Sequence, residues 1–352
     1  MEKRRKIGLW FITALLFPFI FCSITSCSDD DNDNNKKSYK YLYASNEREN
    51  TSLADREKYA PYGWRLECLT DETMPKNHRT CLDDFKERDV IPGYAPDYMP
   101  SIKGLKELKA SASANFSSSG FDGLLSALRK LHQGPITIVD LRSETHGFFN
   151  GMQLSHYGFQ NWANIGLSLE ETMEKEHGEI HDAMGKVIIG ATIDSDNNYV
   201  PIDPIDINVS TAQTEGEACA LRGVGYIRFN SLDHAFPSDR NIERFISFIQ
   251  SLPENIWLHF HCKAGKGRTS TYLTIFDMLR NPDLSLRDAA YRQYKLGGEF
   301  VLDDGSKPNE KEWKIPLKQE RVEMLQLLEQ YIKENRKNNY AVKWSEWKKK
   351  FQ

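Results

Sequence analysis

The stretch "HFHCKAGKGRTS" (residues 259–270) sets a cysteine directly after an apolar run and an arginine six residues later. The residues "IWLHFH" (256–261) are expected to form a buried strand, and "RTSTYLTIFDMLR" (268–280) is expected to form a helix. The segment "CKAGKG" (262–267) would then be a tight loop that ends at a helix N-terminus. Backbone N–H groups at such a place bind anions, and the helix dipole favours negative charge there. This order of elements predicts an anion-binding cradle with Cys262 at its base.

The side chains of this loop suit nucleophilic chemistry on a phosphate group. The loop amides and Arg268 are expected to stabilise the thiolate form of Cys262. Arg268 can also present two parallel N–H donors to phosphate oxygens. A buried structural cysteine in a glycine-rich turn is the alternative, whereas a Walker-type nucleotide loop would need lysine after its last glycine. The other loop residues predicted to contact the ligand are Lys263, Ala264, Gly265, Lys266, Gly267 and Thr269.

A proton donor for the leaving oxygen is expected in "LDHAFPSD" (residues 232–239). Asp233 follows the strand candidate "GYIRFN" (225–230), so it should lie at the same end of the sheet as Cys262. The alternative is that Asp233 caps a helix or forms a turn. Ser238 or Asp239 is better placed to cap the following helix, which leaves Asp233 for the chemistry.

The alternation of strand and helix candidates predicts an α/β fold, with a core sheet flanked by helices and the site at the carboxyl ends of the strands. Between about residues 152 and 210 the pattern changes to short strand candidates separated by Asp- and Asn-rich turns. This stretch is interpreted as a small β-rich insertion in a main domain of residues 38–352.

The N-terminal residues are expected to direct export. Residues 1–26 carry a basic start and an apolar run, and they end at "ITSC", which resembles a bacterial lipobox with Cys27 as the acylated residue. A single-pass anchor is the alternative, although the run is near the minimum spanning length. Residues 27–37 are polar and acidic, which is typical of a disordered tether. The predicted location is the outer membrane or cell surface, with the periplasmic face also possible, held through lipid on Cys27.

Composition limits the other partners. The formal net charge of -4 gives no general preference for nucleic acid, so an anion site must come from local clustering of cations. No metal-ligand cluster is evident, and neither a metal nor another cofactor is predicted. Cys68 and Cys81 could form a disulfide outside the cytoplasm, but their spacing leaves the pairing open.

Several stretches together resemble the cysteine-dependent, protein-tyrosine-phosphatase-like phytases, which are myo-inositol polyphosphate phosphatases. The resemblance runs from about residue 60 to the C-terminus. It implies a tyrosine-phosphatase-like core, a partial-barrel insertion and a cationic pocket, with residues 38–352 as the phosphatase domain. The stretches are "PKNHRT" (75–80), "VDLRSETHGFFNG" (139–151), "YGFQNWANIG" (157–166), "LDHAFP" (232–237), "HCKAGKGRT" (261–269) and "YRQYKLGG" (291–298).

Carried over by position, the resemblance makes Cys262 the nucleophile, Arg268 the phosphate clamp and Asp233 the general acid, with His234 touching a substrate phosphate. One departure is Gly185, where the family often carries histidine. The lysine of "GSKPNEKEWKIPLK" (305–318) that binds substrate stays undecided among Lys307, Lys311, Lys314 and Lys318. The remaining substrate-site residues implied are Arg79, Asp140 and Lys186, and Gln293 or Thr269 is a candidate to position the attacking water.

The implied reaction is hydrolysis of myo-inositol hexakisphosphate and lower inositol polyphosphates through a phosphocysteine. A substrate with six phosphates, each carrying about -1.5 to -2 charge, requires cations spread around the pocket rim. Two alternatives stay open. One is a protein-tyrosine or phosphoinositide phosphatase, and the other is a lipoprotein that binds inositol phosphates without turnover.

Overall fold

The computed structural model describes residues 39–89, 94, 97–194 and 199–352. The predicted export signal, the acidic tether and Cys27 lie outside the described residues. Within the described part of the chain, no helix has the length and apolar character needed to span a bilayer.

A five-stranded sheet forms the core, in the order β10-β4-β11-β3-β2. Four of its strands run parallel, and β2 is antiparallel to β3. The register aligns His261 with Asp140 on β4 and with Ser113 on β3, so the three strands end together. The strands are β2 (Arg79–Thr80), β3 (Ala110–Ser113), β4 (Ile136–Asp140), β10 (Gly225–Arg228) and β11 (Trp257–His261).

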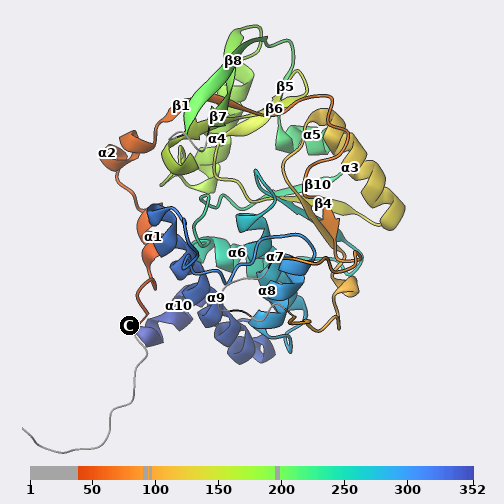
Figure 1. The fold of residues 1–352 in the computed structure, drawn as a ribbon, viewed down its shortest axis with the longest axis vertical. Helices are drawn as coiled ribbons and strands as arrows, with labels where there is room; N and C mark the ends of the chain where they lie inside the picture. Colours follow the sequence, from red (N-terminus) through yellow and green to blue (C-terminus); the bar gives the residue numbers. More distant parts are fainter. Residues whose placement is uncertain (1–38, 90–93, 95–96, 195–198) are drawn as a thin grey trace, which may run out of the picture. The chain divides into compact units, whose positions relative to one another are not determined.

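Helices cover this sheet on both sides. Helices α6 to α9 gather on one side and α3 lies on the other (Figure 1). This confirms the predicted α/β core flanked by helices. The helices are α1 (Ala44–Glu49), α2 (Leu53–Arg56), α3 (Ser118–Leu131), α4 (Leu169–Asp182), α5 (Glu215–Leu221), α6 (Asp239–Ser251), α7 (Gly267–Arg280), α8 (Leu286–Lys295), α9 (Ile315–Asn335) and α10 (Trp344–Lys348).

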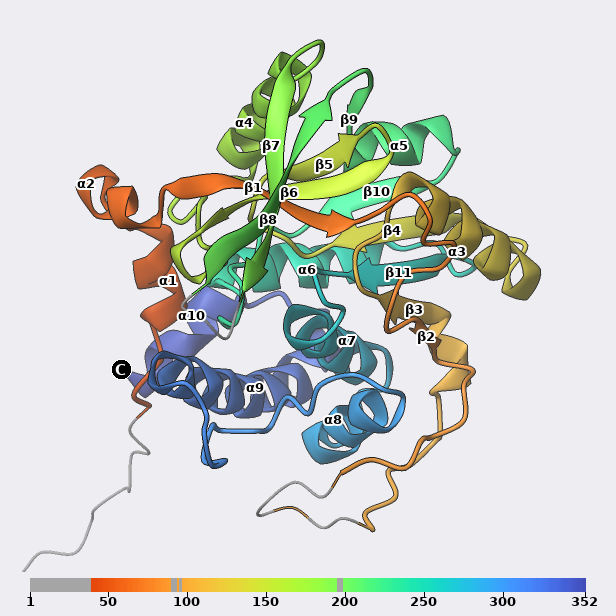
Figure 2. The ribbon, with the colours of Figure 1, turned by 45° about the horizontal axis from the view of Figure 1, so that its top comes forward.

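A second sheet of six strands stands beside the first (Figure 2), in the order β8-β7-β1-β6-β5-β9. It is an open sheet and not a closed barrel, since among the described residues β8 and β9 do not pair with each other, and this agrees with the predicted partial barrel. The sheet also takes a strand from outside the predicted insertion, because β1 pairs with both β6 and β7. Its strands are β1 (Pro61–Cys68), β5 (His146–Phe149), β6 (Met152–Gly158), β7 (Val187–Asp194), β8 (Val200–Asn208) and β9 (Ala212–Thr214).

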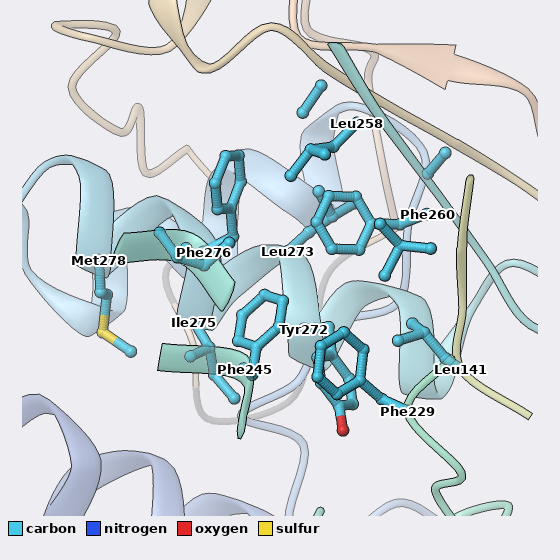
Figure 3. Packing of buried hydrophobic residues seen from close by; sticks show 14 of the residues in the cluster. Leu141, Phe229, Phe245, Leu258, Phe260, Tyr272, Leu273, Ile275, Phe276 and Met278 are labelled. Atoms are coloured by element: carbon cyan, nitrogen blue, oxygen red, sulfur yellow. The ribbon is translucent and has the colours of Figure 1, made fainter. Parts of the chain in front are cut away.

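Apolar packing holds helix α7 against strand β11 (Figure 3). The Phe260 ring of β11 lies 5.6 Å from the Phe276 ring of α7. Tyr272, one turn nearer the start of α7, contacts the Phe229 and Phe245 rings at 5.7 and 5.0 Å. Both ends of the loop that joins β11 to α7 are therefore anchored in the core.

The small residues of β3 allow this loop to sit low on the sheet. Gly265 has φ +65°, and a Cβ atom there would lie 2.3 Å from the backbone of Ser113. A larger residue at position 265 would therefore push the loop off the end of β3. The parallel strands and this close approach bring the loops after β3, β4, β10 and β11 to one edge of the sheet.

Candidate active site

The loop after β11 forms an anion cradle. Among the described residues, nothing accepts a hydrogen bond from the backbone N–H groups of Lys263, Ala264, Gly265 or Lys266. Helix α7 begins at Gly267 without a side-chain N-cap. Free N–H groups and an uncapped helix N-terminus attract a negatively charged group.

Cys262 lies at the base of this cradle and is 3 % exposed. It forms no disulfide. Behind it, His261 is fully buried and contacts Glu215, the first residue of α5, with 2.6 Å between Nε2 and Oε1. The hydroxyl of Thr269 is also buried and has no hydrogen-bond partner among the described residues. Buried polar groups of His261, Glu215 and Thr269 therefore surround the nucleophile candidate on its inner side.

Arg268 is held by Glu144 in a two-point contact. Its Nη1 donates to Oε2 at 2.7 Å and its Nη2 donates to Oε1 at 3.1 Å. Nη1 also donates to the carbonyl of Ser231 at 3.1 Å. Since a guanidinium has five N–H donors, the Nε–H and one Nη2–H stay available on the same edge. That edge offers the parallel pair of donors that a phosphate accepts.

A chain of buried ion pairs extends from Glu144 to the six-stranded sheet. Arg142 Nε donates to Glu144 at 2.9 Å, and Arg142 Nη1 donates to Glu67 at 2.8 Å. Glu67 also pairs with Arg65, its neighbour on β1. Burial would raise the pKa of Glu67, but Arg142 and Arg65 outweigh burial and lower this pKa to about 2. The network fixes Arg268 and ties the two sheets together.

This network predicts loss of stability in acid. The Glu67 pKa is lowered in the folded state from an ordinary value of 4.5, so ionised Glu67 stabilises the fold above about pH 4.5, and this contribution is lost as the pH falls toward 2. Glu215 behaves in the same way, with its pKa lowered to about 2. We expect the free energy of unfolding in urea to decrease over this pH range, and less steeply in Glu67→Gln. A free energy that stays constant between pH 4.5 and 2 would contradict the ion-pair network.

Asp233 lies across the cradle from Cys262. One carboxylate oxygen is 3.3 Å from Arg268 Nε, and the other accepts a hydrogen bond from Asn161 at 3.1 Å. The indole of Trp162 donates to the Asp233 carbonyl at 2.8 Å, which fixes this loop. Burial raises the Asp233 pKa, but Arg268 and then His234 lower it to about 2.

A cavity of about 460 Å³ lies beside Asp233 and the first residues of the cradle loop. Its lining includes Asp233, His234, Lys263 and Ala264 from the predicted site, and Lys314 from the start of α9. Neither Lys263 nor Lys314 forms an ion pair with a described carboxylate. Burial lowers the Lys263 pKa, and repulsion from Arg65 adds to this effect. An anionic ligand would relieve both costs.

Known proteins with the same arrangement identify the family. The family described as "PTPlike_phytase: Inositol hexakisphosphate" matches residues 139–280. The tandemly repeated protein tyrosine phosphatase like phytase of Mitsuokella multacida superposes with a TM-score of 0.77 at 39 % identity, over 82 % of this chain and 49 % of that chain. Residues 139–280 of this chain thus form a protein-tyrosine-phosphatase-like phytase domain, and its fold is that of these phytases.

Further relatives agree with this assignment. A second Mitsuokella multacida structure, a PTP-like myo-inositol phosphatase in complex with myo-inositol-(1,3,4,5)-tetrakisphosphate, gives a TM-score of 0.78 at 36 % identity over 89 % of this chain and 52 % of that chain. A PTP-like phytase from Bdellovibrio bacteriovorus gives 0.62 at 26 % identity, over 82 % and 95 %. Effector protein hopD2 of Pseudomonas syringae is 27 % identical over 70 % of this chain and 53 % of its own. The chain thus spans about half the length of the Mitsuokella proteins and of hopD2.

Two residues predicted for the substrate site lie behind the cradle. Arg79 is 2 % exposed, and its Nη1 donates to the Gly265 carbonyl at 2.8 Å. Gln293 is also 2 % exposed and lines a small cavity with Arg79. Arg79 therefore supports the loop from below, and neither residue lines the 460 Å³ cavity.

Asp140 and Lys186 are not at the pocket either. Asp140 is fully buried, where its carboxylate accepts from Tyr226 at 2.8 Å and lies 3.3 Å from His146. Lys186 is exposed before the start of β7, whereas Thr192, farther along β7, lines the pocket. At about 3.3 Å per residue these two positions are roughly 20 Å apart. Both residues were assigned to the substrate by the resemblance. Neither lines this pocket, and their contact with substrate stays a prediction.

The structure bears on two questions that the sequence left open. Lys307 and Lys318 both pair with Asp303 at 3.1 Å, Lys311 donates to Tyr199 at 3.0 Å, and Lys314 lines the pocket, so Lys314 becomes the preferred candidate. Cys68 and Cys81 are buried free thiols.

The sequence analysis missed four residues that hold the ion-pair network or line the pocket. They are Glu144 after β4, Arg65 and Glu67 on β1, and Trp313 beside His234. A signal for Glu144 existed, because "LRSE" follows the strand candidate whose end faces the cradle. For Glu67 there was none, because β1 is more than seventy residues before Arg142.

Proposed function

We propose that this protein is a phosphoric monoester hydrolase that acts on myo-inositol hexakisphosphate and lower inositol polyphosphates. The observation that carries this proposal is the combination of one anion cradle with unpaired cations farther out. The cradle holds the phosphate that reacts, and Lys263 and Lys314 meet other phosphates of the same ring. A pocket for a single phosphate on a phenol would need no such cations.

The proposed reaction has two steps. In the first, the Cys262 thiolate attacks phosphorus, the ester P–O bond breaks, and the carboxyl proton of Asp233 moves to the leaving inositol oxygen. In the second, water attacks the phosphocysteine, its proton moves to the Asp233 carboxylate, and the S–P electron pair returns to sulfur. Arg268 and the loop amides stabilise the charge on the transferring phosphoryl group in both steps. Neither step requires a metal.

The substrate class is tested by comparing two substrates under reducing conditions, because a catalytic thiolate is open to oxidation. Phosphate release from inositol hexakisphosphate is measured against release from a phosphotyrosine peptide at equal concentration. We expect kcat/KM to be larger for the inositol substrate. An equal or reversed ratio would assign the site to protein or lipid phosphate. Binding without release by the reduced protein would make it a binding protein.

The pH profile should report Asp233. In the free protein its pKa is about 2, held down by Arg268 and His234. A bound phosphate competes for Arg268 and adds negative charge beside the carboxylate, so the pKa should rise in the complex. We expect an activity maximum in mild acid and an alkaline limb of the kcat profile that disappears in Asp233→Asn. If the limb is unchanged in this variant, Asp233 is not the general acid.

Lys314 should contribute to binding of phosphates that do not react. Lys314→Gln is expected to lower kcat/KM for inositol hexakisphosphate by about tenfold, mainly through KM, because the lost contact acts before and during the reaction. Activity on p-nitrophenyl phosphate, which has one phosphate, should change by less than about twofold. Lys307→Gln is the matched control, since Lys307 pairs with Asp303. Equal losses on both substrates would exclude this role.

We also propose that the mature protein is an exported lipoprotein tethered through Cys27 at the outer membrane or cell surface. The support is the basic and apolar start, the "ITSC" ending and the acidic residues 27–37. Cell fractionation in a bacterial host with metabolic labelling by palmitate tests it. We expect membrane association and label in the wild type, and neither in Cys27→Ala. A membrane-bound Cys27→Ala protein would favour a single-pass anchor.

A further inference from the structure

A second cluster of chemically reactive side chains lies outside the phosphate site. His177 and His181 are one turn apart on α4, and their rings are 4.3 Å apart. Glu217 reaches them from α5: His181 Nε2 is 2.9 Å and His177 Nε2 is 3.8 Å from its Oε1. Within the part of the chain that the structure describes, this is the one group of three such residues whose donor atoms lie within 4.8 Å of one another.

These separations match the spacing of donors around a small metal ion. Imidazole nitrogen and carboxylate oxygen bind Zn²⁺ at about 2.0–2.2 Å in tetrahedral geometry, so two donors on the same ion are about 3.4 Å apart. The distances from Glu217 Oε1 to His181 Nε2 and His177 Nε2, 2.9 and 3.8 Å, lie on either side of that value. The partial exposure of His177 and His181, at 65 % and 36 % of the side chain, leaves room for a water ligand and a path for the ion.

Glu217 is oriented for this role by its own helix. It forms a capping box with Thr214, in which Oε2 accepts from the Thr214 N–H at 2.9 Å. This contact fixes the carboxylate and turns Oε1 toward the two imidazoles. Hydrogen bonds that fix a ligand in this way strengthen metal binding.

We propose that His177, His181 and Glu217 form a binding site for a divalent transition metal such as Zn²⁺. Two imidazoles and one carboxylate are a donor set that suits zinc, copper or nickel better than magnesium or calcium. The sequence analysis predicted no metal site, because the carboxylate comes from an element 36 residues beyond His181.

A metal ion at this site would connect two helices that lie close to the support of the catalytic loop. His177 follows Glu176, which pairs with Arg228 at 2.7 Å beneath the core sheet. Glu217 is two residues from Glu215, which contacts His261 directly before the nucleophile candidate. A metal that joins α4 to the first turn of α5 would therefore restrain the buried carboxylate that supports the catalytic loop.

Metal binding is tested directly by titration. The full chain carrying Cys262→Ser, without a histidine tag, is titrated with ZnCl₂ by calorimetry, so that the Cys262 thiol does not compete for zinc. We expect one zinc ion to bind per chain, and His177→Gln or Glu217→Gln on the same background to weaken binding by at least about tenfold. His156→Gln is the matched control, because His156 pairs with Glu179 at 3.0 Å but belongs to no such cluster. Undiminished zinc binding in both ligand variants, or no binding in the parent, would overturn the proposal.

A second measurement tests the link between the two helices. Hydrogen exchange of the Cys262→Ser protein should slow in α4 and α5 when zinc is added, and this protection should be lost in His177→Gln. Because His177 is largely exposed, this variant is expected to fold. Protection that persists in His177→Gln would place the ion elsewhere. Neither measurement uses turnover, so both stand apart from the proposed hydrolase activity.

Discussion

Replacing Cys262 by serine is expected to lower kcat for inositol hexakisphosphate by about 10⁴-fold or more. A hydroxyl in the same cradle stays protonated, and no described base lies against it to remove the proton. The loop amides, Arg268 and the outer lysines are unchanged, so the substrate should still bind. Phosphate release measures the decrease in kcat, and calorimetric titration with the substrate measures whether binding is retained.

Cys219→Ala is the matched control for this experiment. Cys219 is also a buried free thiol, but it lies on α5 in the apolar core and faces no anion site. This variant should keep its activity within a few-fold, although it loses some stability through the small cavity. Retention of more than about 1 % of the activity in Cys262→Ser would remove the thiol from the reaction.

Arg268→Lys is expected to lower kcat by about 10³-fold although it keeps the positive charge. Lysine cannot make the two-point contact with Glu144 at 2.7 and 3.1 Å while it also offers two parallel donors to phosphate. The transferring phosphoryl group would therefore lose a clamp that acts most strongly in the transition state. Steady-state kinetics should show a large decrease in kcat and a smaller change in KM.

Arg222→Lys serves as the control for this second prediction. Arg222 donates to Asp122 at 2.7 Å on the far side of α3, so its replacement should leave kcat unchanged. A melting curve for each variant separates loss of chemistry from loss of fold, since Glu144 keeps Arg142 as a partner in Arg268→Lys. A fall in kcat of less than about tenfold would mean that charge alone is sufficient at position 268.

The core of the fold could be predicted because its elements carry strong local patterns. The strand before Cys262 is a short apolar run, and the amphipathic helices α3 and α6 show the expected apolar spacing. Parallel strands then place Asp233 and Cys262 at one edge of the sheet without further information. The nucleophile, the clamp and the acid candidate come together for that reason.

Other elements depend on contacts that the local sequence does not show. Strand β3 reads "ASAS" and has weak strand propensity, yet it is buried because small residues let Gly265 approach. Strand β1 joins a sheet whose other strands begin about eighty residues later. The burial of Asp140 and Arg79 follows from the same long-range packing. Asp140 and Arg79 lie in stretches that match the family's motifs. A motif does not show which of its side chains face the pocket.

The phosphocysteine separates this mechanism from a protein that binds inositol phosphates without turnover, and a rapid quench tests it directly. The reduced protein is mixed with ³²P-labelled inositol hexakisphosphate, stopped within milliseconds in alkaline denaturant and digested. We expect the label on the peptide that contains Cys262, stable in alkali and lost in mild acid, and absent from Cys262→Ser. Steady release of phosphate with no label on this peptide at any quench time would contradict the proposed role of Cys262.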